Sequence, residues 1–161
     1  MNLDVVVNTT PIIALGKIEQ LRLLRELYGS ITIPIAVVLE VAVKDDFAFR
    51  HMVENFEWIK VAECPEYDRN AFSSRLHAGE IEAIVLAQFL NADFLILDDN
   101  DARRTAINFG LNVVGTAGTL LSAKEHGIIN DVKPIIDAMR KNNFYLSERI
   151  LNTVLRKAGE S

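Results

Sequence analysis

The sequence is poor in the features that mark secreted and membrane proteins. It has a single cysteine, Cys64, so no disulfide can form within the chain, and this fits a reducing compartment. No apolar run approaches the roughly 20 residues that a membrane-spanning helix needs. The first residues carry no basic segment ahead of an apolar core, as a secretion signal would. We therefore expect a cytoplasmic protein with no membrane partner.

Positive charge and zinc-binding motifs are also lacking. The chain has 17 Lys and Arg against 22 Asp and Glu, a net charge of −5. Proteins that bind nucleic acid tightly and without specificity normally carry a basic footprint, so that class is disfavoured. A nuclease stays compatible, because bound cations cancel the charge of a carboxylate cluster locally. The sequence contains neither an HExxH nor a CxxC pattern, which disfavours a zinc ion as the functional centre.

The chain does have enough apolar residues for a substantial core. Half of its 161 residues are hydrophobic, which predicts one domain over residues 1–161. Short apolar runs alternate with amphipathic segments, and this alternation is typical of a parallel sheet with helices on both faces. We therefore predict an α/β protein with a three-layer α/β/α arrangement. The expected strands are 3–7, 31–33, 58–61, 94–97 and 113–114, and the expected helices are 12–15, 18–27, 36–43, 45–56, 79–90, 102–109, 117–125, 132–141 and 146–157.

Acidic or polar side chains follow several of these strands. Asn8 follows the first, Glu40 lies one helical turn beyond the second, Asp98 and Asp99 follow the fourth, and Thr116 follows the last. The helix that leads into the Asp98 strand begins with Glu80. Because ligand sites of open α/β sheets lie outside the carboxyl ends of the strands, we expect these side chains at one edge. Clustered carboxylates suit Mg²⁺ or Mn²⁺, which prefer oxygen ligands.

Each carboxylate also has a purely structural interpretation. Glu80 suits the dipole of a helix N-terminus, Glu40 can face solvent, and Asp99 or Asp101 can cap the helix that follows. The functional interpretation gains weight because acids recur at the same edge. Its geometric test is whether the side-chain oxygens of Asn8, Glu40, Glu80, Asp98 and Asp99 converge.

Four stretches carry a family resemblance: VVVNTTPIIAL, IPIAVVLEV, GEIEAIVLA and ADFLILDDNDAR. Over about residues 3–125 the chain resembles the PIN-domain ribonucleases, and most closely the VapC-like toxins of prokaryotic toxin–antitoxin pairs. The Asn-Thr-x-Pro form after the first strand resembles one branch of that superfamily. The resemblance implies a PIN-like core with a helical extension over about 131–158.

The resemblance also implies the site and its reaction. The four acidic positions of the family fall on Asn8, Glu40, Glu80 (rather than Glu82) and Asp98, and a fifth falls on Asn100, for which Asp99 or Asp101 could substitute. The implied reaction is endonucleolytic cleavage of RNA with Mg²⁺ or Mn²⁺ held by Glu40, Glu80, Asp98 and Asp99. The implied partners are RNA, a cognate antitoxin protein and a second copy in a homodimer. The residues expected to contact RNA are Thr9, Thr10, Arg103, Arg104 and Thr116.

The amide at Asn8 leaves a second function open. An amide oxygen coordinates a hard cation more weakly than a carboxylate, so the chain could be a catalytically weak or inactive PIN domain that binds RNA or protein. A phosphoacceptor signalling domain, the third hypothesis, needs an acidic pair after the first strand and a lysine after a late strand. Asn8 and Gly115-Thr116 supply neither.

Overall fold

A parallel sheet forms the centre of the protein. The computed structural model describes residues 3–161, and its sheet has the strand order β3-β2-β1-β4-β5. Every pairing is parallel, so the predicted α/β fold with a central parallel sheet is confirmed. The strands are β1 (Val5–Val7), β2 (Ile31–Pro34), β3 (Ile59–Ala62), β4 (Phe94–Ile96) and β5 (Val113–Val114).

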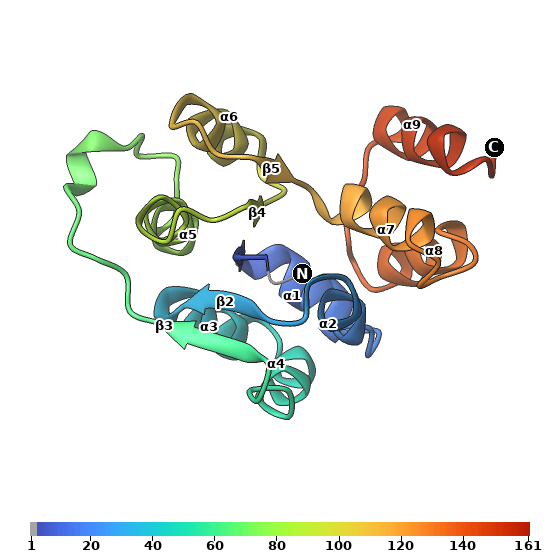
Figure 1. Ribbon diagram of the computed structural model, residues 1–161, viewed down its shortest axis with the longest axis horizontal. Coiled ribbons are helices and arrows are strands. Elements are labelled where there is room, and N and C mark those ends of the chain that lie inside the picture. Colours follow the sequence, from blue (N-terminus) through green and yellow to red (C-terminus); the bar gives the residue numbers. More distant parts are fainter. Residues whose placement is uncertain (1–2) are drawn as a thin grey trace.

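Helices connect the strands and cover both faces of the sheet (Figure 1). They are α1 (Thr9–Gly16), α2 (Arg22–Tyr28), α3 (Ile35–Lys44), α4 (Asp46–Val53), α5 (Ala78–Phe89), α6 (Asn100–Asn108), α7 (Thr116–Glu125), α8 (Lys133–Lys141) and α9 (Glu148–Ala158).

The alternation of side chains along β1 divides the core in two. Val6 packs with α5 and α6 on one face of the sheet, whereas Val5 and Val7 pack with α1, α2 and α7 on the other. Successive side chains of a strand point to opposite faces, so three valines in a row serve both layers. The result is the three-layer arrangement that the sequence predicts, with α5 and α6 lying opposite α1, α2 and α7 in Figure 1.

Two helix starts differ from the sequence prediction, and local backbone geometry explains both. The predicted helix 18–27 begins only at Arg22, because Glu19 adopts a left-handed conformation (φ 56°) that ends the preceding turn. Helix α6 begins at Asn100 rather than at Ala102, because the Asp99 carboxylate accepts a hydrogen bond from the backbone N–H of Ala102 at 2.9 Å. Asp99 is thus the N-cap that the sequence left open between Asp99 and Asp101.

The start of α1 is a further correction. The sequence predicts a helix from residue 12, but α1 already begins at Thr9 and its N-cap position is Asn8, whose backbone is extended. The Asn8 side chain makes no capping hydrogen bond. Its amide group is therefore directed elsewhere, which matters for the site described below.

The segment that connects β3 to α5 contains a short 3₁₀ helix, Arg69–Ala71. The Arg69 guanidinium donates to the carbonyl oxygens of Phe72, Ser73 and Leu76 at 3.4, 3.1 and 2.9 Å. These bonds tie the segment to the start of α5.

The C-terminal helices pack on the body of the chain. Leu151, Val154 and Leu155 of α9 are buried in the same core as Leu120 of α7. The Glu160 carboxylate accepts hydrogen bonds from the backbone N–H groups of Val132 and Lys133. These three side chains of α9 are thus covered within the chain, whereas Ile150 of the same helix is 43% exposed. No helix within residues 3–161 combines the length and apolar character required to cross a bilayer.

Candidate functional site

Asn8 stands at the carboxyl end of the central strand with an unused acceptor. Its side chain is buried, with 4% of the residue exposed, and its backbone N–H donates to the carbonyl of Ile96 at 3.0 Å. Among the described residues, nothing donates a hydrogen bond to its side-chain oxygen Oδ1. Buried polar atoms are nearly always paired in folded proteins, so this oxygen marks a position where a cation or a donor from outside the chain would be stabilised.

Asp98 follows β4, the neighbour of β1, and is held by the start of α7. Its Oδ1 accepts from the Thr116 backbone N–H at 2.9 Å, and its Oδ2 accepts from the Thr116 hydroxyl at 2.6 Å. Burial raises the pKa of Asp98, whereas these two bonds and the Arg103 charge oppose the rise. The carboxylate is therefore fixed in orientation and poor in solvent, as a metal ligand or catalytic acid is in many active sites.

Glu40 reaches the same edge from α3. Its Oε2 accepts a hydrogen bond from the Thr9 hydroxyl at 3.2 Å and lies 3.5 Å from the Lys44 ammonium. On its other side the carboxyl group packs against Gly79, where an added Cβ would come within 1.9 Å of Oε1 and 2.8 Å of Cδ. Only glycine leaves room for the Glu40 carboxyl in this place.

We expect Gly79→Ala to displace the Glu40 carboxyl without unfolding the protein. The clash involves the far end of a flexible side chain, and alanine favours the helix by up to about 1 kcal/mol over glycine. The free energy of unfolding should therefore stay within about 1 kcal/mol of the unaltered value, while any metal binding that uses Glu40 weakens by roughly 10- to 100-fold. Urea unfolding and metal titration of the same sample test both. Gly118→Ala, at a contact of 3.1 Å to Val114, is the matched control.

Glu80 lies at the start of α5, where it serves the helix and faces two other acids. Its Oε1 accepts from the His77 backbone N–H at 2.9 Å, so the structural interpretation of an acid at a helix N-terminus is correct. Only 9% of the residue is exposed, and burial raises its pKa. The His77 N–H opposes this rise, and the negative charges of Asp99 and Glu40 add to it. A bound cation would relieve that repulsion.

Glu82, the alternative third acid, has a different set of charged neighbours. Its pKa is also raised by burial and by the charge of Glu40, but Asp99 influences Glu80 and is not among the causes for Glu82. Glu80 is accordingly the acid of α5 that faces both flanking carboxylates.

The oxygen atoms of Asn8, Glu40, Glu80, Asp98 and Asp99 are of the kind that bind a hard cation, although the carboxylates do not lie close together. Oxygen donors, an unpaired buried amide oxygen and repelling acids are what Mg²⁺ or Mn²⁺ would stabilise. Within residues 3–161, however, no group of three or more His, Cys, Asp or Glu side chains stands close enough to hold a metal ion as placed. The convergence sought from the sequence is therefore incomplete: Asp98 is bound to Thr116, Glu40 to Thr9, and Asp99 to the start of α6.

The residues expected to contact RNA occupy different settings. Arg104 forms an ion pair with Asp101 on the exposed side of α6, the solvated arrangement that is common for surface arginines. Arg103 approaches Asp98 across Gly115, where an added Cβ would lie 2.7 Å from the guanidinium and 3.0 Å from Asp98 Oδ1. The hydroxyl of Thr9 donates a hydrogen bond to Glu40, and that of Thr116 donates to Asp98. Both hydroxyl protons are therefore bound to carboxylates of the site.

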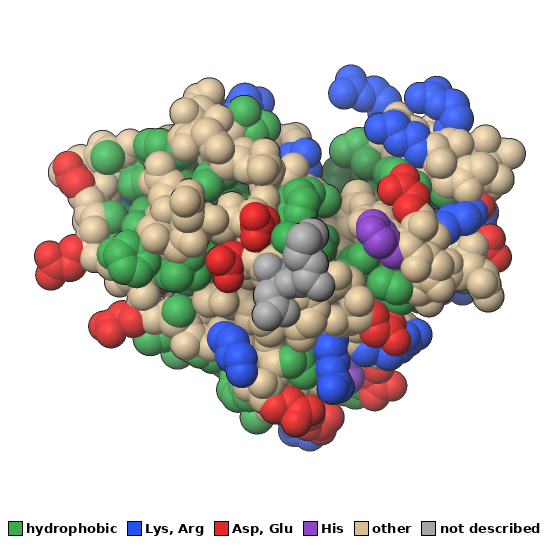
Figure 2. Space-filling model, in the orientation of Figure 1, with side chains coloured by type: hydrophobic (Ala, Val, Ile, Leu, Met, Phe, Trp, Pro, Cys, Tyr) green, Lys and Arg blue, Asp and Glu red, His purple; other side chains and the backbone are tan. Residues whose placement is uncertain are grey.

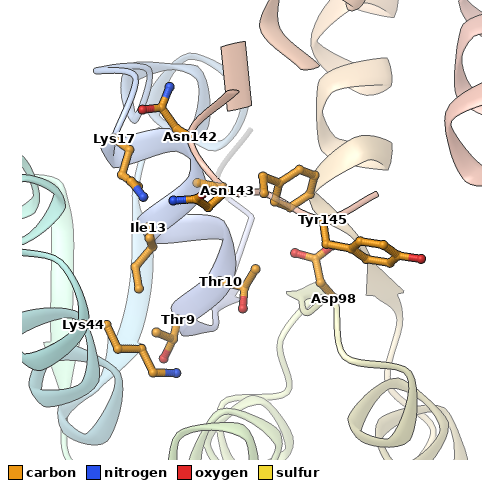
Figure 3. Close-up of a pocket in the computed structure, with 11 residues that line it drawn as sticks. Thr9, Thr10, Ile13, Lys17, Lys44, Asp98, Asn142, Asn143 and Tyr145 are labelled. Atoms are coloured by element: carbon orange, nitrogen blue, oxygen red, sulfur yellow. The ribbon is translucent and has the colours of Figure 1, made fainter. Parts of the chain in front are cut away.

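Sequence reasoning missed a cavity that opens beside Asp98. It has a volume of about 320 Å³ and is lined by Thr9 and Thr10, by Lys17 and Lys44, and by the connection between α8 and α9. Figure 3 shows Tyr145 of that connection beside Asp98, with the two lysines on the opposite side. Local sequence gives no signal for this meeting, because the residues come from four segments spread between positions 9 and 145.

Charge on the face shown in Figure 2 is mixed. Basic side chains gather at the upper right, over α9, and acidic and basic side chains are interspersed over the rest of this face. The view fits the net charge of −5 and shows no broad basic surface among the described residues on that face.

Comparisons with known proteins support the fold and identify the family. A PilT N-terminus domain protein from the hyperthermophilic archaeon Sulfolobus solfataricus has a similar structure, with a TM-score of 0.51 and 21% sequence identity over 77% of this chain and 96% of that one. None of the curated proteins has a significantly similar sequence. The family model described as DUF3368, PIN domain, matches residues 4–160 and so includes the C-terminal helices. The chain therefore belongs to this family of PIN domains, a class whose members are generally nucleases.

Proposed function

We propose that this protein is a Mg²⁺- or Mn²⁺-dependent endoribonuclease whose site lies where β1 and β4 end. The observation that carries the proposal is the buried Asn8 oxygen, which lacks a donor among the described residues at the edge that Asp98 shares. Glu80, on the helix leading to β4, supplies a further acid whose pKa is raised by burial and by neighbouring carboxylates. Membership of the PIN family supports a nuclease function.

Each residue has a separate part in the proposed reaction. Glu40, Glu80 and Asp98 would hold the cation, with Asp99 and the Asn8 amide oxygen as auxiliary ligands. A bound Mg²⁺ or Mn²⁺ would supply an activated water and neutralise charge on the phosphate. Thr116 and Thr9 keep the carboxylates of Asp98 and Glu40 in place through the hydrogen bonds described above. Arg103, beside Asp98, is positioned to attract a phosphate oxygen.

Cleavage of RNA by the purified protein tests the proposal. We expect single-stranded RNA to be cut when Mg²⁺ or Mn²⁺ is present and to remain intact in EDTA. Ribonuclease contamination is controlled by a preparation of Glu80→Gln purified in the same way. If the unaltered protein, free of any bound inhibitor, cuts no RNA with either metal, the enzymatic proposal is wrong.

Metal binding should also appear as a pH-dependent stabilisation. A raised pKa means that folded Glu80 and Asp98 keep protons that the unfolded chain releases, so their contribution to the free energy of unfolding falls as pH rises from their ordinary to their raised values. In EDTA these two groups therefore favour stability at acidic pH over neutral pH. Saturating metal at pH 7, at about 100 times Kd, adds about 2.7 kcal/mol, or roughly 5–11 °C in Tm at this chain length.

Thermal unfolding at pH 5 and at pH 7, with and without metal, checks this expectation. The metal-induced shift should shrink at pH 5, because the ligands must lose protons to bind. Glu80→Gln and Asp98→Asn should each flatten the pH dependence in EDTA. A metal-induced shift equal to that of NaCl at matched ionic strength would contradict the proposed site.

A second candidate function is a PIN domain that binds RNA or protein without cutting it. The neutral Asn8 in place of an acid favours it, as does the absence, within the described residues, of a tightly gathered carboxylate group. This function predicts RNA binding in EDTA and no cleavage with metal. Cleavage by the unaltered protein would eliminate it.

The biological setting we propose is the toxin half of a toxin–antitoxin pair, acting in the cytoplasm as a homodimer. The resemblance of VVVNTTPIIAL and ADFLILDDNDAR to the VapC-like toxins supports it. Induced expression should arrest growth of the host, and co-expression of the product of an adjacent open reading frame should restore it. Light scattering of the purified chain measures the oligomeric state. Unimpaired growth on expression of protein shown to be active in vitro would count against the toxin role.

A further inference from the structure

The connection between α8 and α9 brings an exposed aromatic ring to the candidate site. Tyr145 is 84% exposed, yet it lines the same cavity as Asp98 (Figure 3). An exposed tyrosine beside a polar cavity offers a flat apolar face at little further loss of rotamer freedom. In proteins that bind single-stranded nucleic acid, the bases commonly stack on such aromatic rings.

The connection is held in place, so Tyr145 is presented from a fixed support. Asn143 adopts a left-handed conformation (φ 71°) that turns the chain after α8, and the Phe144 backbone N–H donates to the Met139 carbonyl at 3.1 Å. The Phe144 side chain packs against the main core. An ion pair between Arg140 and Glu148, at 3.2 Å, spans the two helices. A ring on a fixed support costs less to order on binding.

The opposite wall of the cavity is basic in an otherwise acidic protein. Lys17 and Lys44 both line it. Their acidic partners are at hand but not closely bonded, with Lys17 at 3.6 Å from Asp45 and Lys44 at 3.5 Å from Glu40. Two ammonium groups facing one small cavity suit an anionic group such as a phosphate.

A second cavity is also lined by Asp98. It is lined by Arg103 and, from the C-terminal helices, by Leu146 and Ile150. Asp98 thus belongs to both cavities, and residues 142–146 stand along them. If an RNA strand crossed the site, its phosphodiester bond nearest Asp98 would lie between the two cavities. Each cavity is lined by a cationic side chain.

We propose that the cavity between α1, α3 and the α8–α9 connection is a nucleotide subsite for single-stranded RNA, in which a base stacks on Tyr145 and a phosphate lies near Lys44 and Lys17. The choice of RNA rests on the proposed ribonuclease function. A duplex is disfavoured because its bases are already stacked and paired, whereas an unpaired base can be splayed onto a ring. The C-terminal helices then form part of the substrate site, beyond their packing in the core.

Stacking is tested with the full chain in EDTA, where cleavage does not interfere. The probes are short oligouridylates that carry a single 2-aminopurine, moved along the strand, because the fluorescence of this base is quenched when it stacks. At one position we expect quenching by the unaltered protein and by Tyr145→Phe, and none by Tyr145→Ala. The Kd of Tyr145→Ala should rise about 5- to 150-fold, the range for loss of one base–aromatic stack.

Matched variants separate these contacts from general surface effects. Phe89→Ala removes a ring that is 71% exposed on α5 and does not line the cavity, and it should leave quenching and Kd unchanged. Lys44→Gln should reduce the slope of log K against log salt by about 0.7. Lys133→Gln is its control, because Lys133 has nearly the same exposure, 56% against 57%, and also pairs with an acid four residues away on its own helix.

The outcomes distinguish the subsite from the enzymatic proposal. Binding that depends on Tyr145 supports the subsite even if no cleavage is found with metal. If Tyr145→Ala binds and quenches like Phe89→Ala, the subsite is wrong and the cavity belongs to another occupant, such as a segment of a protein partner. That result leaves the ribonuclease proposal standing on its own cleavage assay.

Discussion

Asp98→Asn should lower RNA cleavage by about 100-fold or more without unfolding the protein. Loss of residues that merely support a metal ligand costs about 10- to 100-fold, and Asp98 is placed as a ligand itself. The asparagine keeps an oxygen for the Thr116 backbone N–H, and its amide N–H can donate to the Thr116 hydroxyl. Because burial raises the pKa of Asp98, removal of the charge should leave the metal-free fold as stable as before or more so.

A rate assay and urea unfolding on the same preparation check this expectation. Asp101→Asn is the control, since it makes the same chemical change three residues on, at an acid paired with Arg104 on the exposed side of α6. Thr116→Val removes the hydroxyl that donates to Asp98 at 2.6 Å. Its loss of cleavage rate should lie between those of the other two variants, at about 10- to 100-fold. Equal activity of Asp98→Asn and Asp101→Asn would remove Asp98 from the site.

Asn8→Asp should destabilise the metal-free protein strongly and make its stability depend on metal. The side chain is 4% exposed, and its Oδ1 has no donor within the described residues. A carboxylate there would be a buried charge without a partner, which costs about 3–5 kcal/mol at neutral pH. The charge would also add to that of the neighbouring acids.

Bound metal should reverse the loss of stability caused by Asn8→Asp, because the new carboxylate is a better ligand for a hard cation than the amide. In EDTA at pH 7 we expect Tm to fall by roughly 6–20 °C at this chain length, and with saturating Mn²⁺ most of that loss should be recovered. Cleavage by Asn8→Asp should exceed that of the unaltered protein if the amide limits metal affinity. Asn108→Asp, at the exposed C-terminal end of α6, controls for added charge. An Asn8→Asp variant with unchanged Tm in EDTA would show that Asn8 does not border a cation site.

The sequence alone determined the architecture, because the strands and the polar residues that follow them are local signals. VVV at 5–7 and FLIL at 94–97 are short apolar runs followed by a polar residue, and the mainly apolar ITI at 31–33 is followed by proline. Such runs become strands buried on both faces. Parallel strands place their carboxyl ends at one edge, which is why Asn8 and Asp98 could be assigned to the same place. The predicted starts of α1, α2 and α6 were wrong. For α2 and α6 the reason is that a left-handed Glu19 and the Asp99 cap are decided by backbone geometry rather than by hydrophobic pattern.

Only the tertiary structure decided what each of these polar side chains contacts. The fit of the Glu40 carboxyl against Gly79 joins residues 39 positions apart in the numbering of the chain, and the bonds from Thr116 to Asp98 span 18. The side-chain oxygen of Asn8 is unpaired because none of the described residues around it donates a hydrogen bond to it. Tyr145 and Asp98 line one cavity because α7, α8 and α9 pack on the same core and bring the C-terminal helices to this edge of the sheet. Periodicity reports which face of an element is buried, but pairing between distant side chains depends on how the packed elements meet in space.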